Sequence, residues 1–153
     1  FRRVLFRSLV YLEKSVEIND KVSVLCLPHQ GSVQPGASCV VAGWGFASNF
    51  HRSSTPLRSH TVPVVSRQTC NKVSSYAGLV KEKMICAGFE EGGDDRCYGD
   101  GGGPLMCKDV QGKWFVGGIN SWGQGCGLRG KYGVFTLTES FRDWIDRYLR
   151  DNY

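Results

Sequence analysis

Short apolar runs alternate with clusters of turn residues along most of the chain. Some runs alternate apolar and polar side chains, and others are continuously apolar. Most runs end at Gly, Ser, Asn or Pro, and this pattern is typical of β-strands joined by turns. The pattern predicts strands at Ser38–Trp44, Thr61–Val65, Met84–Ala87, Leu105–Lys108, Lys113–Trp122 and Tyr132–Thr138. Their spacing favours a β-sandwich or a β-barrel.

The last segment has a helical period instead. Its apolar side chains recur at positions i, i+3, i+4, i+7 and i+8, and they are Phe141, Trp144, Ile145, Tyr148 and Leu149. This spacing places them along one side of an α-helix. We therefore predict a helix over 139–150 that docks on the β-structure. Its polar face carries charges of both signs, which argues against a helix lying on a membrane surface.

Composition narrows the class of protein. The 153 residues match one ordinary domain, and the 41% apolar content is enough to form a core. Glycine contributes 20 residues without a Gly-X-Y period, which fits a turn-rich β chain and excludes collagen. No apolar run approaches the roughly 18 residues that a membrane-spanning helix needs, so we expect no membrane span.

The basic charge is concentrated in an unusual first segment. The formal charge is 19 − 14 = +5, and residues 1–8 supply three of the arginines. This segment resembles one reading frame of a sequencing-library adapter, in which case it is an artefact and the chain is a fragment. A genuine targeting segment is the alternative, but a long apolar stretch and a cleavage site are missing. Without these residues the charge is 16 − 14 = +2. No basic stripe then remains, so we expect no nucleic-acid partner.

The cysteine count is odd. The seven cysteines are Cys26, Cys39, Cys70, Cys86, Cys97, Cys107 and Cys126, and none of them forms a C-x-x-C pair. That spacing argues against a zinc or redox site, and we predict no metal. One alternative is that the cysteines are unpaired, buried residues that only fill the core. In a glycine-rich β chain, disulfides in an oxidising compartment are favoured, with one thiol left to pair outside the chain.

A glycine-rich loop carries the strongest chemical signal. The stretch from Asp94 to Pro104 places Gly99, Gly101, Gly102 and Gly103 around Asp100. Successive backbone N–H groups in such a loop suit an anion or a developing oxyanion. The alternative is an ordinary glycine turn that precedes a strand.

From about Leu9 to Trp144, the chain resembles the chymotrypsin/trypsin-like serine protease family. Where that family carries Gly-Asp-Ser-Gly-Gly-Pro, this chain has Gly-Asp-Gly-Gly-Gly-Pro at Gly99–Pro104. Further matching motifs are Leu27–Pro28, Gly43–Gly45, Met84–Gly88, Ser121–Gly123, Gly125–Cys126, Gly133–Thr136 and Trp144–Ile145. The resemblance implies an all-β fold. We expect a six-stranded antiparallel barrel, the C-terminal half of the family's double barrel, with a C-terminal α-helix. Residues 9–36 then form the end of the first barrel and the inter-barrel strap, and residues 37–153 form the second barrel.

The resemblance also assigns the catalytic positions. The nucleophilic serine falls at Gly101, and the oxyanion hole falls at the backbone N–H groups of Gly99 and Gly101. Asp100 falls where the family's new N-terminus pairs after zymogen activation. The catalytic His is absent from the chain. The catalytic Asp would fall near position 6, where Phe6 stands.

A primary specificity pocket is implied as well. Its positions are Asp95, Arg96, Tyr98, Ser121, Trp122, Gly123 and Gly133. Asp95 falls where trypsin-like members bind the Arg or Lys of a substrate. Arg96 either fills that pocket by pairing with Asp95 or turns to solvent or to Asp94. Tyr132 is similar to the residue of a sodium-binding loop, with a packed aromatic as the alternative. No other cofactor is implied.

By the family pattern, Cys39 pairs with Cys107, Cys70 with Cys86, and Cys97 with Cys126. Cys26 then tethers an upstream light chain or pro-segment. Peptide or protein ligands and a secreted, extracellular location are also implied.

Three functions fit these residues. The first is an inactive serine protease homologue, a pseudoprotease with a binding or regulatory role. The second is a secreted endopeptidase that cleaves after Arg or Lys and whose sequence is truncated and misread at position 101. The third is an inactive repeat of a larger polyprotease.

Overall fold

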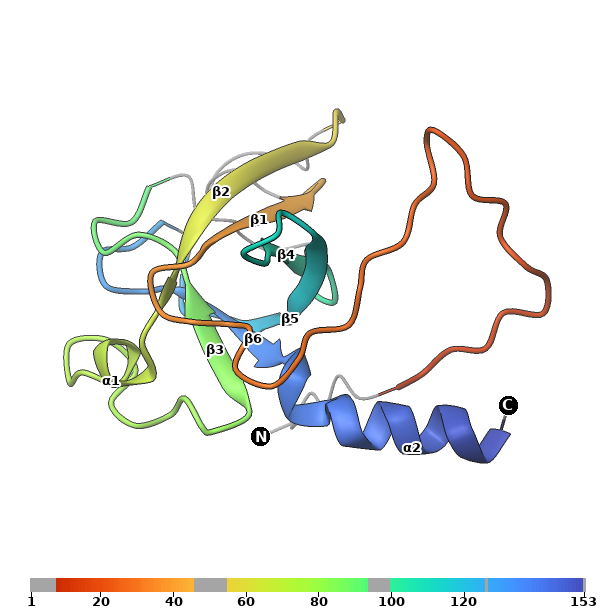
Figure 1. Cartoon of the computed structure of the whole chain (residues 1–153). Helices are drawn as coiled ribbons and strands as arrows, with labels where there is room; N and C mark the ends of the chain where they lie inside the picture. The colour runs from red at the N-terminus through yellow and green to blue at the C-terminus, as the bar shows by residue number, and fades with distance from the viewer. Residues whose placement is uncertain (1–7, 46–54, 94–99, 126, 153) are drawn as a thin grey trace.

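Six antiparallel strands close into a barrel in the computed structural model, which describes residues 8–45, 55–93, 100–125 and 127–152 (Figure 1). The strands follow one another around the barrel in the order β1-β2-β3-β6-β5-β4. They are β1 (Ser38–Gly43), β2 (Arg58–Val65), β3 (Met84–Ala87), β4 (Pro104–Lys108), β5 (Trp114–Trp122) and β6 (Gly133–Leu137). The predicted six-stranded barrel is therefore confirmed.

Alternating side chains of these strands fill the barrel interior. On β1 and β2, for example, Cys39, Val41, Val62 and Val64 are each at most 5% exposed, whereas the residues between them are more accessible. The cluster continues on the other strands with Ile85, Ala87, Leu105, Cys107, Phe115 and Phe135, and Val33 joins it from outside the strands. Burial of each large apolar side chain contributes about 1.5–3 kcal/mol, and this burial holds the strands in register.

Two disulfides tie separate parts of the barrel together. Cys39 and Cys107 are register partners on β1 and β4, and their disulfide closes a sequence separation of 68 residues. A link across a loop of that length stabilises a fold by about 4 kcal/mol in the chain-entropy model. The second disulfide joins Cys70 to Cys86. These are two of the three pairs that the family resemblance implies, and Cys97 and Cys126 lie outside the described residues.

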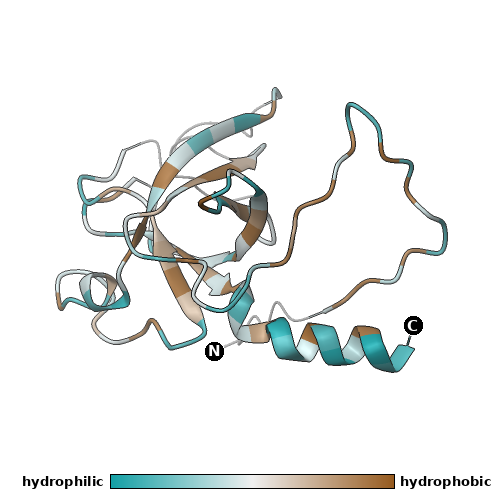
Figure 2. Cartoon of the chain, viewed as in Figure 1, coloured by the Kyte–Doolittle hydropathy of each residue, from teal (hydrophilic) through white to brown (hydrophobic). Residues whose placement is uncertain are grey.

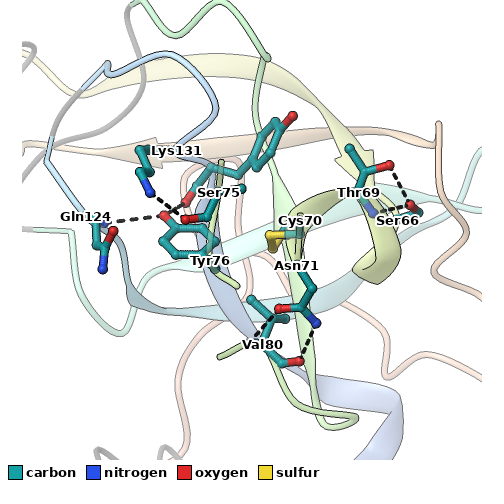
Figure 3. Close-up of a disulfide and its surroundings, with 11 residues drawn as sticks. Ser66, Thr69, Cys70, Asn71, Ser75, Tyr76, Val80, Gln124 and Lys131 are labelled. Carbon is teal, nitrogen blue, oxygen red and sulfur yellow. Dashed lines mark hydrogen bonds between the residues drawn. A yellow bond between two sulfur atoms is a disulfide. The ribbon is translucent and has the colours of Figure 1, made fainter. Parts of the chain in front are cut away.

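A short helix, α1 (Arg67–Cys70), was not predicted from the sequence. The Ser66 hydroxyl caps it by accepting a hydrogen bond from the Thr69 N–H at 3.1 Å. Serine is a preferred N-cap residue because its oxygen satisfies a free N–H of the first turn. The Cys70–Cys86 disulfide then fixes this helix to β3 (Figure 3).

The C-terminal helix is present, but it docks less than expected. A 3₁₀ turn at Thr138–Phe141 precedes α2 (Arg142–Asn152). Only Ile145 of the predicted stripe is buried, whereas Trp144, Tyr148 and Leu149 remain 41–43% exposed. The reason is geometric, since α2 extends beyond the barrel and contacts the rest of the chain mainly near its start (Figure 1). Among the described residues, no helix is long and apolar enough to cross a membrane.

Residues 8–36 form an extended strap, whose first part swings away from the barrel in a wide loop and whose last part runs over the barrel surface (Figure 1). Its first part is exposed and carries several apolar side chains, including Val10 at 81% and Val24 at 72% exposure (Figure 2). The strap meets the barrel at Cys26, whose N–H donates to Trp114 O at 3.2 Å and whose carbonyl accepts from Val116 N at 3.0 Å. Its assignment to a first barrel stays a prediction.

Two side chains from the C-terminal turn and helix hold the strap. The buried Glu139 carboxylate accepts a hydrogen bond from the Val33 N–H at 3.2 Å. Arg142 donates to Pro28 O at 3.0 Å and also pairs with Asp146 on the next turn of α2 at 2.8 Å. The strap and the C-terminus therefore stabilise each other.

Removal of the Glu139 carboxylate should loosen this junction. Glu139→Ala leaves the buried Val33 N–H without its acceptor, so we expect the free energy of unfolding of the full-length protein to fall by about 1–3 kcal/mol. Glu139→Gln keeps an acceptor oxygen and should cost clearly less. The exposed Glu82→Ala is the matched control and should stay within about 0.5 kcal/mol. Urea denaturation measures all three, and equal values for the Ala and Gln variants would contradict the role of this hydrogen bond.

Candidate functional site

The glycine-rich turn lies immediately before β4 and against β5. Within the turn, the Gly103 N–H donates to Asp100 O at 3.0 Å. Across to β5, the Gly102 N–H donates to Asn120 O at 2.9 Å, and the Asn120 N–H donates to Gly103 O at 2.8 Å. Gly102 has a φ of 87°, a conformation that favours glycine. The turn is therefore fixed to β5 on its far side.

The Asp100 carboxylate is buried beneath this turn. Asp100 is 8% exposed, and its Oδ1 accepts a hydrogen bond from the Gly45 N–H at 2.9 Å. A Cβ atom at Gly43 or at Gly45 would overlap the carboxylate. The Gly43–Gly45 motif thus has a physical role that the sequence analysis did not find, because glycine at both positions leaves room for a buried negative charge.

Gly101, by contrast, lies at the surface with open space beside it. Apart from Gly101 itself and its two chain neighbours, no heavy atom of the described residues lies within 4 Å of the position that its Cβ would take. Its φ is also outside the left-handed region. Glycine at position 101 is therefore not required by packing or by backbone conformation, and a serine side chain would fit there.

The end of β5 and the start of β6 bring part of the predicted pocket together. Trp122 pairs with Val134, the residue after Gly133, and the register of β5 shifts between Asn120 and Trp122. Such bulges occur next to active sites, where they redirect side chains. A Cβ at Gly133 would lie 3.0 Å from the Phe135 ring, whereas a Cβ at Gly123 would make only ordinary contacts. Ser121 lies at the same strand end.

Four of the residues predicted for the pocket and the oxyanion hole lie outside the described residues. They are Asp95, Arg96, Tyr98 and Gly99. The role of Asp95 in specificity, the pairing of Arg96 and the oxyanion hole of Gly99 and Gly101 therefore stay predictions.

Tyr76 braces the strand end at Trp122, part of the predicted pocket, and the sequence analysis missed it. Its ring is 1% exposed and packs edge-on against Trp122, with the ring centroids 4.8 Å apart. Its hydroxyl donates to Tyr132 O at 2.5 Å and accepts from the Gln124 N–H at 3.3 Å (Figure 3). One buried side chain thus connects the end of β5 with the start of β6. A lone tyrosine in a polar loop gave no periodic signal.

The loop that carries Tyr76 is itself closed by side chains (Figure 3). Asn71 exchanges two hydrogen bonds with the backbone of Val80, at 2.9 and 3.0 Å. Lys131 donates to Ser75 O at 2.5 Å, and its ammonium group lies 5.3 Å from the centre of the Tyr76 ring. These contacts hold Tyr76 in place against the pocket wall.

Tyr132 is a buried residue at the position of the predicted sodium loop. Burial, followed by the negative charges of Glu90 and Glu91, raises the pKa of Tyr132 above its ordinary value of 10.0. Its carbonyl oxygen already accepts the Tyr76 hydroxyl. The described residues contain no group of three or more His, Cys, Asp or Glu side chains that could hold a metal ion. Sodium binding near Tyr132 stays a prediction.

Comparison with known proteins places these features in context. The family model described as Trypsin matches residues 7–145. "Transmembrane protease serine 11E" of Mus musculus is 40% identical over 139 residues, which cover 90% of this chain and 33% of the relative. "Transmembrane protease serine 11C" of Mus musculus is 38% identical over 139 residues, with 90% and 32% covered. The chain thus spans about a third of the length of the curated relatives it matches.

Glycine at position 43 should be essential to the buried carboxylate. In Gly43→Ala, the new Cβ displaces Asp100 from the Gly45 N–H, so we expect the free energy of unfolding to fall by about 2–4 kcal/mol. Gly101→Ala is the matched control in the same site. It adds the same methyl group into open space and should change stability by less than about 0.5 kcal/mol. Denaturant titration of the full-length variants measures both, and equal losses would contradict this account of Asp100.

The raised pKa of Tyr132 makes an alkaline prediction. Below about pH 10, Tyr132 is neutral in both folded and unfolded chains, and its contribution to stability is fully present. As the pH rises above the unfolded pKa, only the unfolded chain ionises, so stability is lost until the folded pKa is passed. Tyr132→Phe should therefore lose less stability than the parent protein above about pH 10. The control is Tyr148→Phe on the exposed part of α2, and matching alkaline profiles for the two variants would refute the prediction.

Proposed function

The chain belongs to the trypsin family of serine proteases, and on this premise we propose that it is a catalytically inactive member, a pseudoprotease with a binding or regulatory role. The observation that carries the proposal is the glycine at position 101. In the family, the residue at that position supplies the hydroxyl that attacks the peptide carbonyl.

Glycine cannot replace that hydroxyl. Acyl transfer needs an oxygen that a base can deprotonate and that then forms the acyl-enzyme, and Gly101 has no side chain. The backbone N–H groups of Gly99 and Gly101 remain as oxyanion donors. In proteases of this kind, loss of one triad member leaves a residual acceleration of about 10³–10⁴ over water. Against the rate enhancements of about 10⁶ or more that enzymes reach, such a site is silent.

The rest of the site supports a role in binding. The turn at residues 100–103 is hydrogen-bonded to β5, and the Asp100 carboxylate is buried in the space that Gly43 and Gly45 leave. The pocket wall at Trp122 is braced by Tyr76. None of these contacts depends on a side chain at position 101. The fold can therefore keep a peptide-binding surface after losing its nucleophile.

The ligand that we propose is a peptide or protein segment. Asp95 would favour a basic side chain, as it does in trypsin-like members. Arg96 beside it would compete for the same carboxylate, because a guanidinium and a carboxylate form a bidentate pair. A self-filled pocket would bind basic peptides weakly, which agrees with a regulatory role better than with digestion.

Cys26 supports a multi-part parent protein. It is a free, half-buried thiol on the strap, and its backbone bridges to Phe115. We propose that it forms a disulfide to an upstream light chain or pro-segment. The two disulfides among the described residues indicate an oxidising compartment. Together with relatives named as transmembrane proteases, they support an extracellular protease-like domain, either secreted or anchored at the cell surface.

One observation favours a second candidate, an active endopeptidase that cleaves after Arg or Lys. The space beside Gly101 would accept a serine side chain, and its backbone conformation does not demand glycine. This is the geometry expected if the native residue is serine and position 101 is misread.

A serine-directed fluorophosphonate probe distinguishes the two candidates. We expect no labelling of position 101 in the Gly101 protein, because no hydroxyl exists there. We expect labelling after Gly101→Ser in a protein that also carries the upstream part with the catalytic His and Asp. Gly101→Ala is the control, since it adds a methyl group without an oxygen and should stay unlabelled. Mass spectrometry of protein from its native source should find glycine at position 101. A probe adduct on residue 101 of native protein would overturn the proposal and establish the active enzyme.

A further inference from the structure

We infer that Asn120 is a positioning residue whose side-chain amide clamps the glycine-rich turn at residues 100–103. The side-chain Nδ2 of Asn120 donates to the carbonyl oxygen of Asp100 at 3.1 Å. This carbonyl also accepts the Gly103 N–H, which closes the turn. The amide therefore holds the oxygen on which the turn itself is built.

The backbone of the same residue holds the other end of the turn. The Asn120 carbonyl accepts from Gly102 N, and the Asn120 N–H donates to Gly103 O, at 2.9 and 2.8 Å. Backbone bonds of this type would be available to any residue type at position 120 except proline, which has no N–H. The amide bond to Asp100 is available only to a side chain with a donor in this place.

The residue type is unusual for its position. Asn120 is half-buried near the end of β5, directly after the strand residue Ile119. Asparagine is depleted in strands, and a half-buried amide is costly unless its hydrogen bonds are made. The contact with Asp100 satisfies one of the two N–H donors of the amide.

The turn needs such a clamp because of its composition. Gly101, Gly102 and Gly103 follow one another, and glycine loses more conformational freedom on folding than any other residue. The Asp100 side chain is held on Gly45, and the Asp100 carbonyl is held on Asn120. The first residue of the turn is thus fixed through both its side chain and its main chain. None of these bonds uses a side chain at position 101, so the inference does not depend on whether the chain is active.

Hydrogen exchange on the full-length protein tests the clamp directly. Asn120→Leu keeps nearly the same shape but removes the donor, and Asp100 O loses one partner. We expect the amides of residues 100–103 and of Leu105 to exchange about tenfold faster, while those of β3 stay unchanged. Unchanged exchange at the turn, or equal acceleration at the turn and at β3, would overturn the inference.

A second variant separates the hydrogen bond from packing. The side chain of Asn120→Asp has almost the same size, but it donates only when its carboxyl group is protonated. Protection of the turn, corrected for the intrinsic exchange rate, should therefore rise as the pH falls through the range in which that carboxyl group titrates. The variant should show this step in addition to any pH dependence of the turn that the parent protein shows. A variant without pH dependence at the turn would contradict a donor role for residue 120.

The third measurement reads the functional consequence. In the Gly101→Ser background, Asn120→Leu should slow fluorophosphonate labelling about tenfold, because the hydroxyl then lies on a less ordered turn. Equal labelling rates with and without Asn120→Leu would count against positioning. If Gly101→Ser is not labelled at all, that result shows that other parts of the catalytic site are not functional. The exchange measurements then decide the role of Asn120.

Discussion

A buried carboxylate sets the geometry of the candidate site. Asp100 connects the end of β1 to the turn before β4, because its Oδ1 is held by the Gly45 N–H. A carboxylate in the interior is costly unless its oxygens find donors and its surroundings leave room. Glycine at positions 43 and 45 provides that room, since any Cβ there would overlap the oxygens. Because Asp100 is held in this way, the next residue, Gly101, lies at the surface.

In the rest of the site, too, the residues that stabilise the structure are different from the residue at the nucleophile position. Tyr76, Lys131 and the Cys70–Cys86 disulfide stabilise the wall next to Trp122, yet they lie in a different part of the chain from the glycine-rich turn. Asn120 holds the turn from β5. A protein built in this way can lose one reacting atom without losing its surface, because the fold does not depend on that atom. This is the physical basis on which a protease scaffold can serve as a binding module.

The strap and the C-terminal turn form a second unit of support. Glu139 accepts a hydrogen bond from the Val33 N–H, and Arg142 donates one to the Pro28 carbonyl oxygen. Without these side chains, the two backbone groups would lack these hydrogen-bond partners. Beyond these contacts, the strap and most of α2 present apolar side chains to solvent. The amphipathic pattern of α2 therefore describes a surface that this barrel covers only at Ile145.

The sequence by itself determined the strands and the family. Each of the six strands lies within three residues of its predicted bounds. This is because successive side chains of a strand point to opposite faces, so that neighbouring residues in the sequence show the alternation of buried and exposed positions. The glycine at position 101 and the order of the motifs were equally visible. The tertiary structure decided the rest: the brace at Tyr76, the clamp at Asn120, the space that Gly43 leaves for Asp100 and the limited docking of α2. Each of these depends on residues that are distant in the chain but adjacent in space, and no local period records such contacts.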